Sequence, residues 1–476
     1  MALATVSPPK PESKTPIGAF CRVLVTVFSL YLGAIAIRAR LNGVLTSSAL
    51  LTDRYELTML QAALRSGKAN RRGIFEVFAR SLAGGRRFGV FAGSGRLLDL
   101  IQDFRFGDPE INWLLSNKVI DEATATWLAN YKFSGNIWGY AEGEIYFPYS
   151  PVLAVEGTFA EAVVLETLIL SVLNYDSAVA SAASRMVTAA QSRPVSEMGS
   201  RRTGENSAVA AARAAYIAGF SATSNLEAGR SFGIPTMGTA SHAFTLLHDS
   251  EKQAFEAQLE AFGTDTTFLV DTYNIESGIK NAISVAGSKL GGVRIDSGDL
   301  PIEVAKARLL LDQLGAKETK ITVTNDLNEY AIASLASAPV DSYGVGTSVV
   351  TGSGVAAAGF VYKMVAYQNE SGDWHTVSKQ SAKKSNLGGR KFAIRRHSED
   401  DVATAEVIGT GIAPKTQEGD RNLLVQLVTD GVPDKKYQGA NGVELARVHH
   451  AKVKSGLPAS ALRLTKGEPA IQTIFV

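Results

Sequence analysis

Cysteine is almost missing from this chain, which holds one, Cys21, among 476 residues. A single cysteine excludes an intrachain disulfide framework, a cysteine-ligated metal cluster and a Cys–Cys redox pair. Net charge is also small, because 48 lysines and arginines face 46 aspartates and glutamates, for a formal +2. No strong field therefore recruits nucleic acid or a membrane surface, and we expect neither as a partner.

Long hydrophobic runs are scarce as well. Residues 23–37 carry no charge, but 15 residues fall short of the about 18 that a membrane-spanning helix needs. This run follows a proline-rich start, and residues 1–46 admit three interpretations: an over-called start codon, a signal or anchor, and a peripheral helix. We favour the over-called start, because a coherent domain begins near Ser47, and we expect a cytoplasmic protein.

The rest of the chain divides by its hydrophobic pattern. Residues 161–190 are typical of one long helix that is apolar nearly all round in its first half, so we expect it to be buried. From 194 to 365, short strand-like runs alternate with helical stretches, which predicts a parallel sheet, and the number of units favours closure into an α/β barrel. Polar residues gather directly after these strands, where the active sites of barrels form.

The motif GVGTSVVTGSG at 344–354 is typical of a loop that binds a phosphate group. Gly344 and Gly346 allow an anion to approach backbone N–H groups, and Thr347 adds a hydroxyl donor. An ordinary glycine-rich loop is the alternative. The motif matches neither the P-loop nor the Rossmann pattern, so it does not indicate nucleotide binding of those two kinds.

The motif VRIDSGDL at 293–300 places charges at a strand end. Arg294 and Asp296 share one face of the strand by its two-residue period. An interior arginine needs an anionic partner, which is either Asp296 or a bound carboxylate or phosphate. Rim carboxylates could also hold ribose hydroxyls or Mg²⁺. The alternative is a structural Arg–Asp pair with Asp299 as a helix N-cap.

Three further motifs carry candidates whose ordinary interpretation is structural. GTASHAF at 238–244 contains His242, which could be a base or a phosphate acceptor, although a lone histidine is usually structural. EMGSRRTG at 197–204 contains Arg201 and Arg202, for which a solvated surface pair is an even alternative. TDRYELTM at 52–59 contains Tyr55, which could stack on a flat heterocycle but is more often a core or interface residue.

Taken in order, these motifs resemble those of nicotinate phosphoribosyltransferases. The resemblance spans residues 47–476 and rests on TDRYELTM, EMGSRRTG, TSNLEAG, GTASHAF, LVDTY, VRIDSGDL, VTND, GVGTSVVT and VYK. It implies a type II phosphoribosyltransferase fold, with an irregular α/β barrel at 151–365 and an α/β sandwich built from 47–150 and 366–476. Family members are typically homodimers whose sites are completed across the interface, so a homodimer is expected.

The resemblance also implies a reaction. Nicotinate and 5-phosphoribosyl diphosphate give nicotinate mononucleotide and pyrophosphate, the first step of NAD salvage from nicotinate, with ATP hydrolysis coupled through a phosphohistidine. The cofactor expected is Mg²⁺, held mainly by substrate phosphates, and ATP is a cosubstrate. A nicotinamide phosphoribosyltransferase and a catalytically silent ligand-binding homologue are the alternatives.

Residue by residue, the resemblance assigns the site. Catalytic roles fall to His242, as the phosphohistidine, and to Asp296. Nicotinate binding is assigned to Tyr55, Thr239 and Arg294. The remaining substrate-binding positions are Arg202, Asp299, Gly344, Gly346 and Thr347. The chemistry agrees, because nicotinate needs an aromatic stack and a carboxylate partner, and the diphosphate needs amide, hydroxyl and cationic donors.

Overall fold

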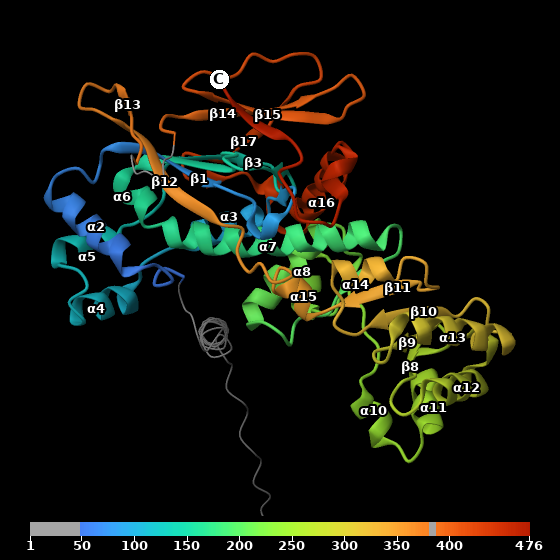
Figure 1. The fold of residues 1–476 in the computed structure, drawn as a ribbon. Coiled ribbons are helices and arrows are strands. Elements are labelled where there is room, and N and C mark those ends of the chain that lie inside the picture. Colours follow the sequence, from blue (N-terminus) through green and yellow to red (C-terminus); the bar gives the residue numbers. More distant parts are fainter. Residues whose placement is uncertain (1–47, 380–386) are drawn as a thin grey trace, which may run out of the picture.

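The structure, a computed structural model, describes residues 48–379 and 387–476, so the expected leader at 1–46 lies outside it. Two sheets and a long helix are layered in one half of the molecule, and a parallel sheet with its helices forms the other half (Figure 1). The mixed α/β class and the sandwich drawn from both ends of the described chain agree with the expectation from the sequence.

The sandwich half contains a seven-stranded sheet and a four-stranded sheet. The larger has the order β13 (Trp374–Thr376), β12 (Phe360–Gln368), β1 (Arg72–Ala79), β5 (Leu153–Thr158), β3 (Asn136–Tyr140), β17 (Leu424–Thr429) and β18 (Val432–Pro433). The smaller has the order β16 (Arg421–Asn422), β14 (Lys391–His397), β15 (Ala403–Thr410) and β19 (Gln472–Phe475). A short pair, β2 (Gly89–Val90) and β4 (Ile145–Tyr146), stands apart. Strand β5 falls in the range expected for the barrel, yet it pairs with β1, with Leu153 opposite Val77.

The other half is a parallel sheet of the order β7 (Ala222–Thr223), β6 (Val195–Glu197), β11 (Ser342–Val345), β10 (Lys320–Thr324), β9 (Gly292–Ile295) and β8 (Thr267–Leu269). The expected barrel does not close, because β7 and β8 do not pair with each other in the described chain. Strand β7 has two residues, and after the next helix a single bridge between Thr223 and Thr236 extends it. The observed sheet is open, with six strands.

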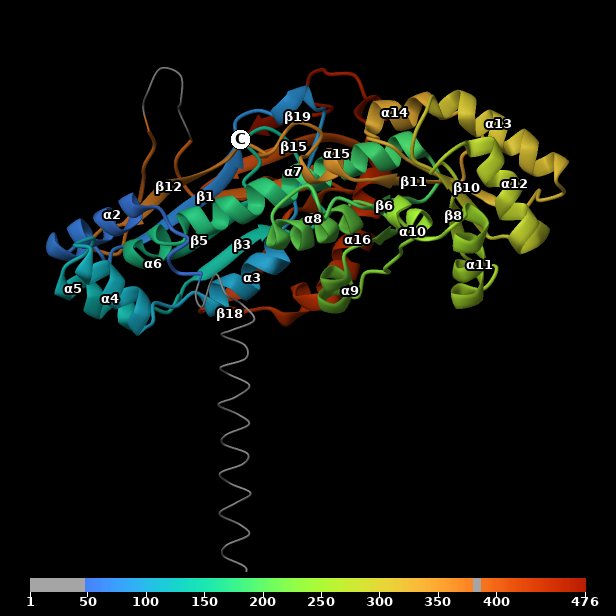
Figure 2. The same cartoon turned by 90° about the horizontal axis from the view of Figure 1, so that it is seen from below.

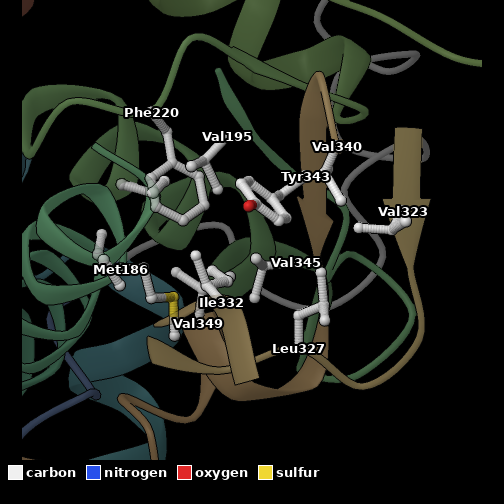
Figure 3. Close-up of a cluster of buried hydrophobic side chains, with 14 of the residues drawn as sticks. Met186, Val195, Phe220, Val323, Leu327, Ile332, Val340, Tyr343, Val345 and Val349 are labelled. Carbon is white, nitrogen blue, oxygen red and sulfur yellow. The ribbon is translucent and has the colours of Figure 1, made fainter. Parts of the chain in front are cut away.

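Helices connect the parallel strands and cover the sheet. They are α8 (Glu205–Ile217), α9 (Leu226–Phe232), α10 (His242–Leu247), α11 (Glu251–Phe262), α12 (Ile275–Ala286), α13 (Leu300–Gln313), α14 (Glu329–Ser334) and α15 (Thr347–Val350). Behind the strand ends, aliphatic side chains from β6, β10 and β11 meet Met186 and Phe220 in a continuous apolar core (Figure 3). This core fixes the positions of the strand ends.

The long helix of the pattern at 161–190 is present as α6 (Phe159–Val163) and α7 (Glu166–Ala190). Residues 159–190 are long and apolar enough to cross a membrane by composition, but 67% of the most apolar window is buried inside the protein. Seventeen residues of α7 are buried, among them every residue of 176–186. The helix is therefore the shared core element that lies under the sandwich and reaches the parallel sheet (Figure 1), as the sequence predicts.

The remaining helices are two central ones, α3 (Ser94–Asp103) and α16 (Gly439–Ser455), and three that lie together at one end of the molecule, α2 (Arg54–Arg65), α4 (Asp108–Ser116) and α5 (Glu122–Ala129). Figures 1 and 2 place α2, α4 and α5 at one end of the molecule and α10 to α13 at the other. This separation decides which candidate residues can meet within one chain.

Candidate active site

Neighbouring strands bring polar side chains to one edge of the parallel sheet. Strands β8, β9 and β10 pair in parallel, so their carboxyl ends meet at the same edge. Six residues at this edge form what we call the rim cluster: Thr239, His242, Asp271, Arg294, Asp296 and Thr324. Four of them, Thr239, His242, Arg294 and Asp296, are candidates from the sequence, and the structure brings these four together.

Arg294 is the best-connected side chain of the rim cluster. Its Nε donates to Thr324 Oγ1 at 2.8 Å, and its Nη1 donates to Thr239 Oγ1 at 2.9 Å and to the Ala240 carbonyl at 3.4 Å. Its Nη2 lies 3.3 Å from Asp296 Oδ1, and the side chain is 16% exposed. A guanidinium carries five N–H donors, so an Nη2 hydrogen stays available. The structural Arg–Asp pair is therefore present, and it leaves a donor for an anionic ligand.

Thr324 joins the two charged side chains of β9 from the next strand. Its hydroxyl accepts from Arg294 Nε and donates to Asp296 Oδ1. The register explains this, because Thr322 pairs with Arg294 and Thr324 lies two residues further on the same face. No sequence motif indicates this role for Thr324, because no single motif specifies the order of the strands in the sheet.

His242 is the first residue of α10 and lies between two carboxylates. Its Nδ1 is 3.1 Å from Thr272 Oγ1. Its Nε2 is 3.8 Å from Asp296 Oδ2 and 3.9 Å from Asp271 Oδ1. The side chain is 42% exposed, so a ligand can reach the ring. A histidine placed in this way is not a buried core residue.

Asp271 is a member of the rim cluster to which the sequence assigned no role. Its Oδ2 accepts from the Asp296 backbone N–H at 2.9 Å and from Ser297 Oγ at 2.6 Å. Its Oδ1 is buried and has no hydrogen-bond partner among the described residues. An unpaired buried oxygen is unfavourable, so a cationic or protonated group close to it is favoured. The available signal was its place in LVDTY, directly after a buried strand.

Cavities flank the rim cluster on both sides. One, of about 570 Å³, lies between α12 and α13 and reaches Asp271 and Ser297. Another, also of about 570 Å³, runs along Thr239 and Ala240 toward Phe244. The rim cluster therefore stands between two open volumes that small organic ligands can enter.

The glycine loop lies beside the rim cluster, because β11 pairs with β10 and Gly344 stands opposite Thr324. A side chain at Gly344 would lie 2.6 Å from Met198 Sδ and 2.6 Å from Thr324 Cγ2, so packing alone requires a glycine here. Gly346 precedes α15, and Thr347, the first residue of that helix, is exposed. The loop thus presents Thr347 at the rim.

Arg201 and Arg202 lie on the loop between β6 and α8, and both side chains are exposed. The loop is anchored by buried Glu197, whose carboxylate accepts from Thr223 Oγ1 at 2.6 Å and from the Gly199 N–H. Burial raises the pKa of Glu197 above its ordinary value. Because β6 pairs with β11, the loop begins beside the glycine loop, where a side chain at Gly199 would lie 2.9 Å from the Gly346 carbonyl oxygen.

Asp299 occupies the N-cap position of α13, but its side chain makes no capping hydrogen bond. It is exposed at the same edge of the sheet as Asp296. The capping role that was the structural alternative for Asp299 is therefore not observed.

Tyr55 lies far from both the rim cluster and the glycine loop. It lies on α2, at the opposite end of the molecule from α10 and His242 (Figures 1 and 2). Partial burial and the nearby Glu166 carboxylate raise the pKa of its phenol. Glu166 also lies 3.7 Å from Lys363 Nζ, so Tyr55, Glu166 and Lys363 form a second polar group. Tyr55 remains 46% exposed.

The residues at the rim suit a divalent cation only in part. Asp271 and Asp296 converge on His242, and Asp271 Oδ1 has no partner among the described residues. No group of three or more His, Cys, Asp or Glu side chains in the described chain could hold a metal ion by itself. Two carboxylates completed by ligand phosphates match the set that Mg²⁺ takes in proteins.

The fold belongs to the type II phosphoribosyltransferase class. The structure of human nicotinic acid phosphoribosyltransferase matches it with a TM-score of 0.75 at 24% identity, over 89% of this chain and 97% of that chain. The structure of nicotinate-nucleotide pyrophosphorylase from Pyrococcus furiosus matches with a TM-score of 0.70 at 23% identity, over 86% and 96%. At these identities the likeness concerns the fold alone.

Sequence relatives then identify the family. Nicotinate phosphoribosyltransferase pncB1 of Mycobacterium tuberculosis is 52% identical over 433 residues, which cover 89% of this chain and 94% of the relative. The nicotinate phosphoribosyltransferase of Bacillus subtilis is 36% identical over 75% of this chain and 76% of its own length. Residues 50–174 match the model of the nicotinate phosphoribosyltransferase N-terminal domain. The chain belongs to the nicotinate phosphoribosyltransferase family.

Proposed function

We propose that the chain is a nicotinate phosphoribosyltransferase. It joins nicotinate to the C1 carbon of 5-phosphoribosyl diphosphate, giving nicotinate mononucleotide and pyrophosphate. The observation that carries this proposal is the rim cluster, where Arg294, His242 and two carboxylates meet at one edge of the parallel sheet. The 52% identity to the mycobacterial enzyme over most of both chains supports it.

Arg294 recognises the nicotinate carboxylate. Its free Nη2 hydrogen and the Thr239 hydroxyl supply donors to the two carboxylate oxygens, and charge-assisted hydrogen bonds of this kind are among the strongest in proteins. Asp296 and Thr324 hold the guanidinium, so little entropy is lost on binding. Nicotinamide, the alternative substrate, has no charge for Arg294 to pair with.

Phosphoribosyl transfer at this site needs positioning and charge stabilisation. The bond from C1 to the diphosphate oxygen breaks as the bond to the pyridine nitrogen forms, and C1 becomes electron-poor. Asp296 supplies negative charge at the rim, while Thr347 and Arg202 bind phosphate groups. A protein nucleophile at C1 is unnecessary, because the pyridine nitrogen is itself the attacking group.

His242 couples the reaction to ATP. The ring nitrogen attacks the γ-phosphorus of ATP, the bond to the β,γ-bridging oxygen breaks, and ADP leaves. Water later hydrolyses the phosphorus–nitrogen bond and returns free His242 with phosphate. The Nε2 of His242 beside Asp271 and Asp296 supports this role, because the side chain is 42% exposed and a phosphate donor can reach the ring.

Mg²⁺ is the cofactor that suits the site. Asp271 and Asp296 are the protein ligands we assign to it, with phosphate oxygens of the substrates completing its shell. When bound, it neutralises phosphate charge and makes pyrophosphate a better leaving group.

The active unit is a homodimer in which each site takes residues from both subunits. Tyr55 stands too far from His242 in one chain to stack on a ring bound by Arg294, and its exposed position on α2 makes it available to a second copy (Figure 2). We place the enzyme in the cytoplasm, at the first step of NAD salvage from nicotinate.

A product assay tests the proposal. The purified chain is incubated with 5-phosphoribosyl diphosphate, Mg²⁺ and either nicotinate or nicotinamide, with and without ATP. We expect nicotinate mononucleotide, formed faster with ATP, and little product from nicotinamide. A preference for nicotinamide would support the alternative transferase, and no product with either ring would support a silent homologue.

A further inference from the structure

A second polar cavity lies outside the rim cluster, between α7, α14 and the segment that follows α15. It measures about 310 Å³ and is lined by Arg86, Arg185, Glu329, Ser353 and Lys466, together with neighbouring glycines. We call it the Arg86 pocket. None of these residues has a role in the mechanism above.

Arg86 is a buried cation without a carboxylate partner. The residue is 7% exposed, and its hydrogen bonds go to two backbone carbonyls, from Nη1 to Ala178 at 3.2 Å and from Nη2 to Gly352 at 2.5 Å. No Asp or Glu of the described chain forms an ion pair with it. Burial and the nearby Arg185 lower the pKa of its guanidinium. Each Nη nitrogen keeps a second hydrogen for a further acceptor.

The carboxylate that lines the Arg86 pocket, Glu329, already has hydrogen-bond partners other than Arg86. Glu329 Oε1 accepts from Arg185 Nε at 3.0 Å, and its Oε2 accepts from Ser353 Oγ at 2.6 Å. Of the three cations, Arg185 is therefore paired, while Arg86 and the exposed Lys466 are not. With three cations and one carboxylate in its lining, the pocket carries a net positive charge of about two.

We propose that the Arg86 pocket binds a small phosphate-bearing anion, at a site distinct from the rim cluster. A buried cation is stable only when it is paired, and a tetrahedral oxyanion supplies both the charge and the several acceptors that Arg86 and Lys466 leave open. The volume accommodates orthophosphate and also the longer diphosphate. Both have the same recognition chemistry, and the test separates them.

The position of the pocket links it to the glycine loop. Thr347 stands at one end of the segment 344–354, and Gly352 and Ser353, which contact Arg86 and Glu329, stand at the other. An anion bound at Arg86 therefore stabilises the far end of the loop whose near end meets the substrate.

Equilibrium dialysis with labelled orthophosphate tests the site on the full chain. Lys466→Glu, at an exposed position that does not threaten folding, should weaken binding by about tenfold or more, and Arg86→Gln should do the same. Arg87→Gln is the matched control, because Arg87 is the adjacent arginine and does not line the pocket. Thr347→Val should keep this binding, since it alters only the rim.

Two results would overturn the proposal. One is orthophosphate binding to Lys466→Glu and Arg86→Gln that equals binding to the wild type and to Arg87→Gln. The other is loss of all binding in Thr347→Val, which would place the anion at the rim. Competition then separates the two ligands: displacement of label at lower concentrations of pyrophosphate than of orthophosphate identifies a diphosphate site, and the reverse identifies a phosphate site.

Discussion

Thr324 shows how much of this site depends on one uncharged side chain. Its hydroxyl holds Arg294 Nε and Asp296 Oδ1 at once. Valine has nearly the same shape and lacks this group, so Thr324→Val leaves two charged side chains short of a partner, at a cost of about 1–3 kcal/mol. We expect the apparent KM for nicotinate, measured by steady-state kinetics, to rise by about tenfold.

The matched control for this change lies on the same strand. Thr322 is two residues earlier on the same face, and its hydroxyl bonds to Ser342 Oγ at 2.8 Å, away from the rim cluster. Thr322→Val should leave the apparent KM for nicotinate unchanged. Equal effects of both substitutions would mean that Thr324 acts through the packing of β10 and not through Arg294.

His242 is tested by the coupling to ATP. His242→Asn keeps a polar side chain at the start of α10 but removes the ring nucleophile, so it should keep slow synthesis without ATP and lose the stimulation by ATP. It should also fail to take acid-labile label from γ-labelled ATP. His248→Asn is the control, because His248 ends the same helix and bonds to the Phe244 carbonyl. If the His242→Asn protein still takes up acid-labile label from γ-labelled ATP, the phosphate acceptor is a residue other than His242.

At the residue scale, the sequence predicts the parts of the site that follow directly from strand ends. Arg294 and Asp296 share a face by the period of a strand, and His242 follows a short strand-like run. Asp271 and Thr324 were not assigned, because their roles depend on which strands are neighbours. That order is fixed by packing of the whole sheet and not by any local pattern.

At the scale of elements, α16 carries a histidine that makes stability depend on pH. His450 is 2% exposed, and its ring lies 2.9 Å from the Gly143 carbonyl and 3.1 Å from Ser184 Oγ. Burial lowers the pKa of His450 to about 4, so the folded chain keeps it neutral while the unfolded chain takes up a proton near pH 6.5. Stability is therefore lost as the pH falls from about 6.5 toward about 4.

Urea unfolding measures this effect. Between about pH 7.5 and pH 5 we expect His450 to contribute a loss of about 2 kcal/mol in the free energy of unfolding. His450→Gln keeps hydrogen-bonding capacity without the ionisation and should flatten this part of the pH dependence. His397→Gln, at a residue on β14 that is not fully buried, should leave it unchanged. The same slope in wild type and His450→Gln would contradict the assignment.

Elements differ in how far the sequence predicts them. Helix α7 is predictable because its apolar residues surround the helix, which is typical of a buried segment. Closure of the barrel is not predictable in this way, because the hydrophobic pattern indicates how many strands there are but not which edge strands pair with each other. Strand β5 likewise looks like any short alternating strand, and only its pairing with β1 places it in the sandwich.

At the scale of the whole molecule, the distance between α2 and α10 leads to a prediction about assembly (Figure 1). Tyr55→Ala and Arg294→Ala should each lose most activity as homodimers. Mixed and allowed to exchange subunits, they should regain about a quarter of wild-type activity, because half of the dimers are mixed and each mixed dimer has one intact site. Activity that does not return, in mixtures shown by native mass spectrometry to contain mixed dimers, would contradict shared sites.

The role of Arg294 is tested most directly by comparing kcat/KM for nicotinate and nicotinamide in the wild type and in Arg294→Gln. We expect the wild type to prefer nicotinate strongly. Arg294→Gln should lower kcat/KM for nicotinate by about tenfold to a hundredfold, with little effect on nicotinamide, because only nicotinate loses a charge-assisted pair. Equal losses for both rings in a folded variant would mean that Arg294 is structural, and the nicotinate site would lie elsewhere.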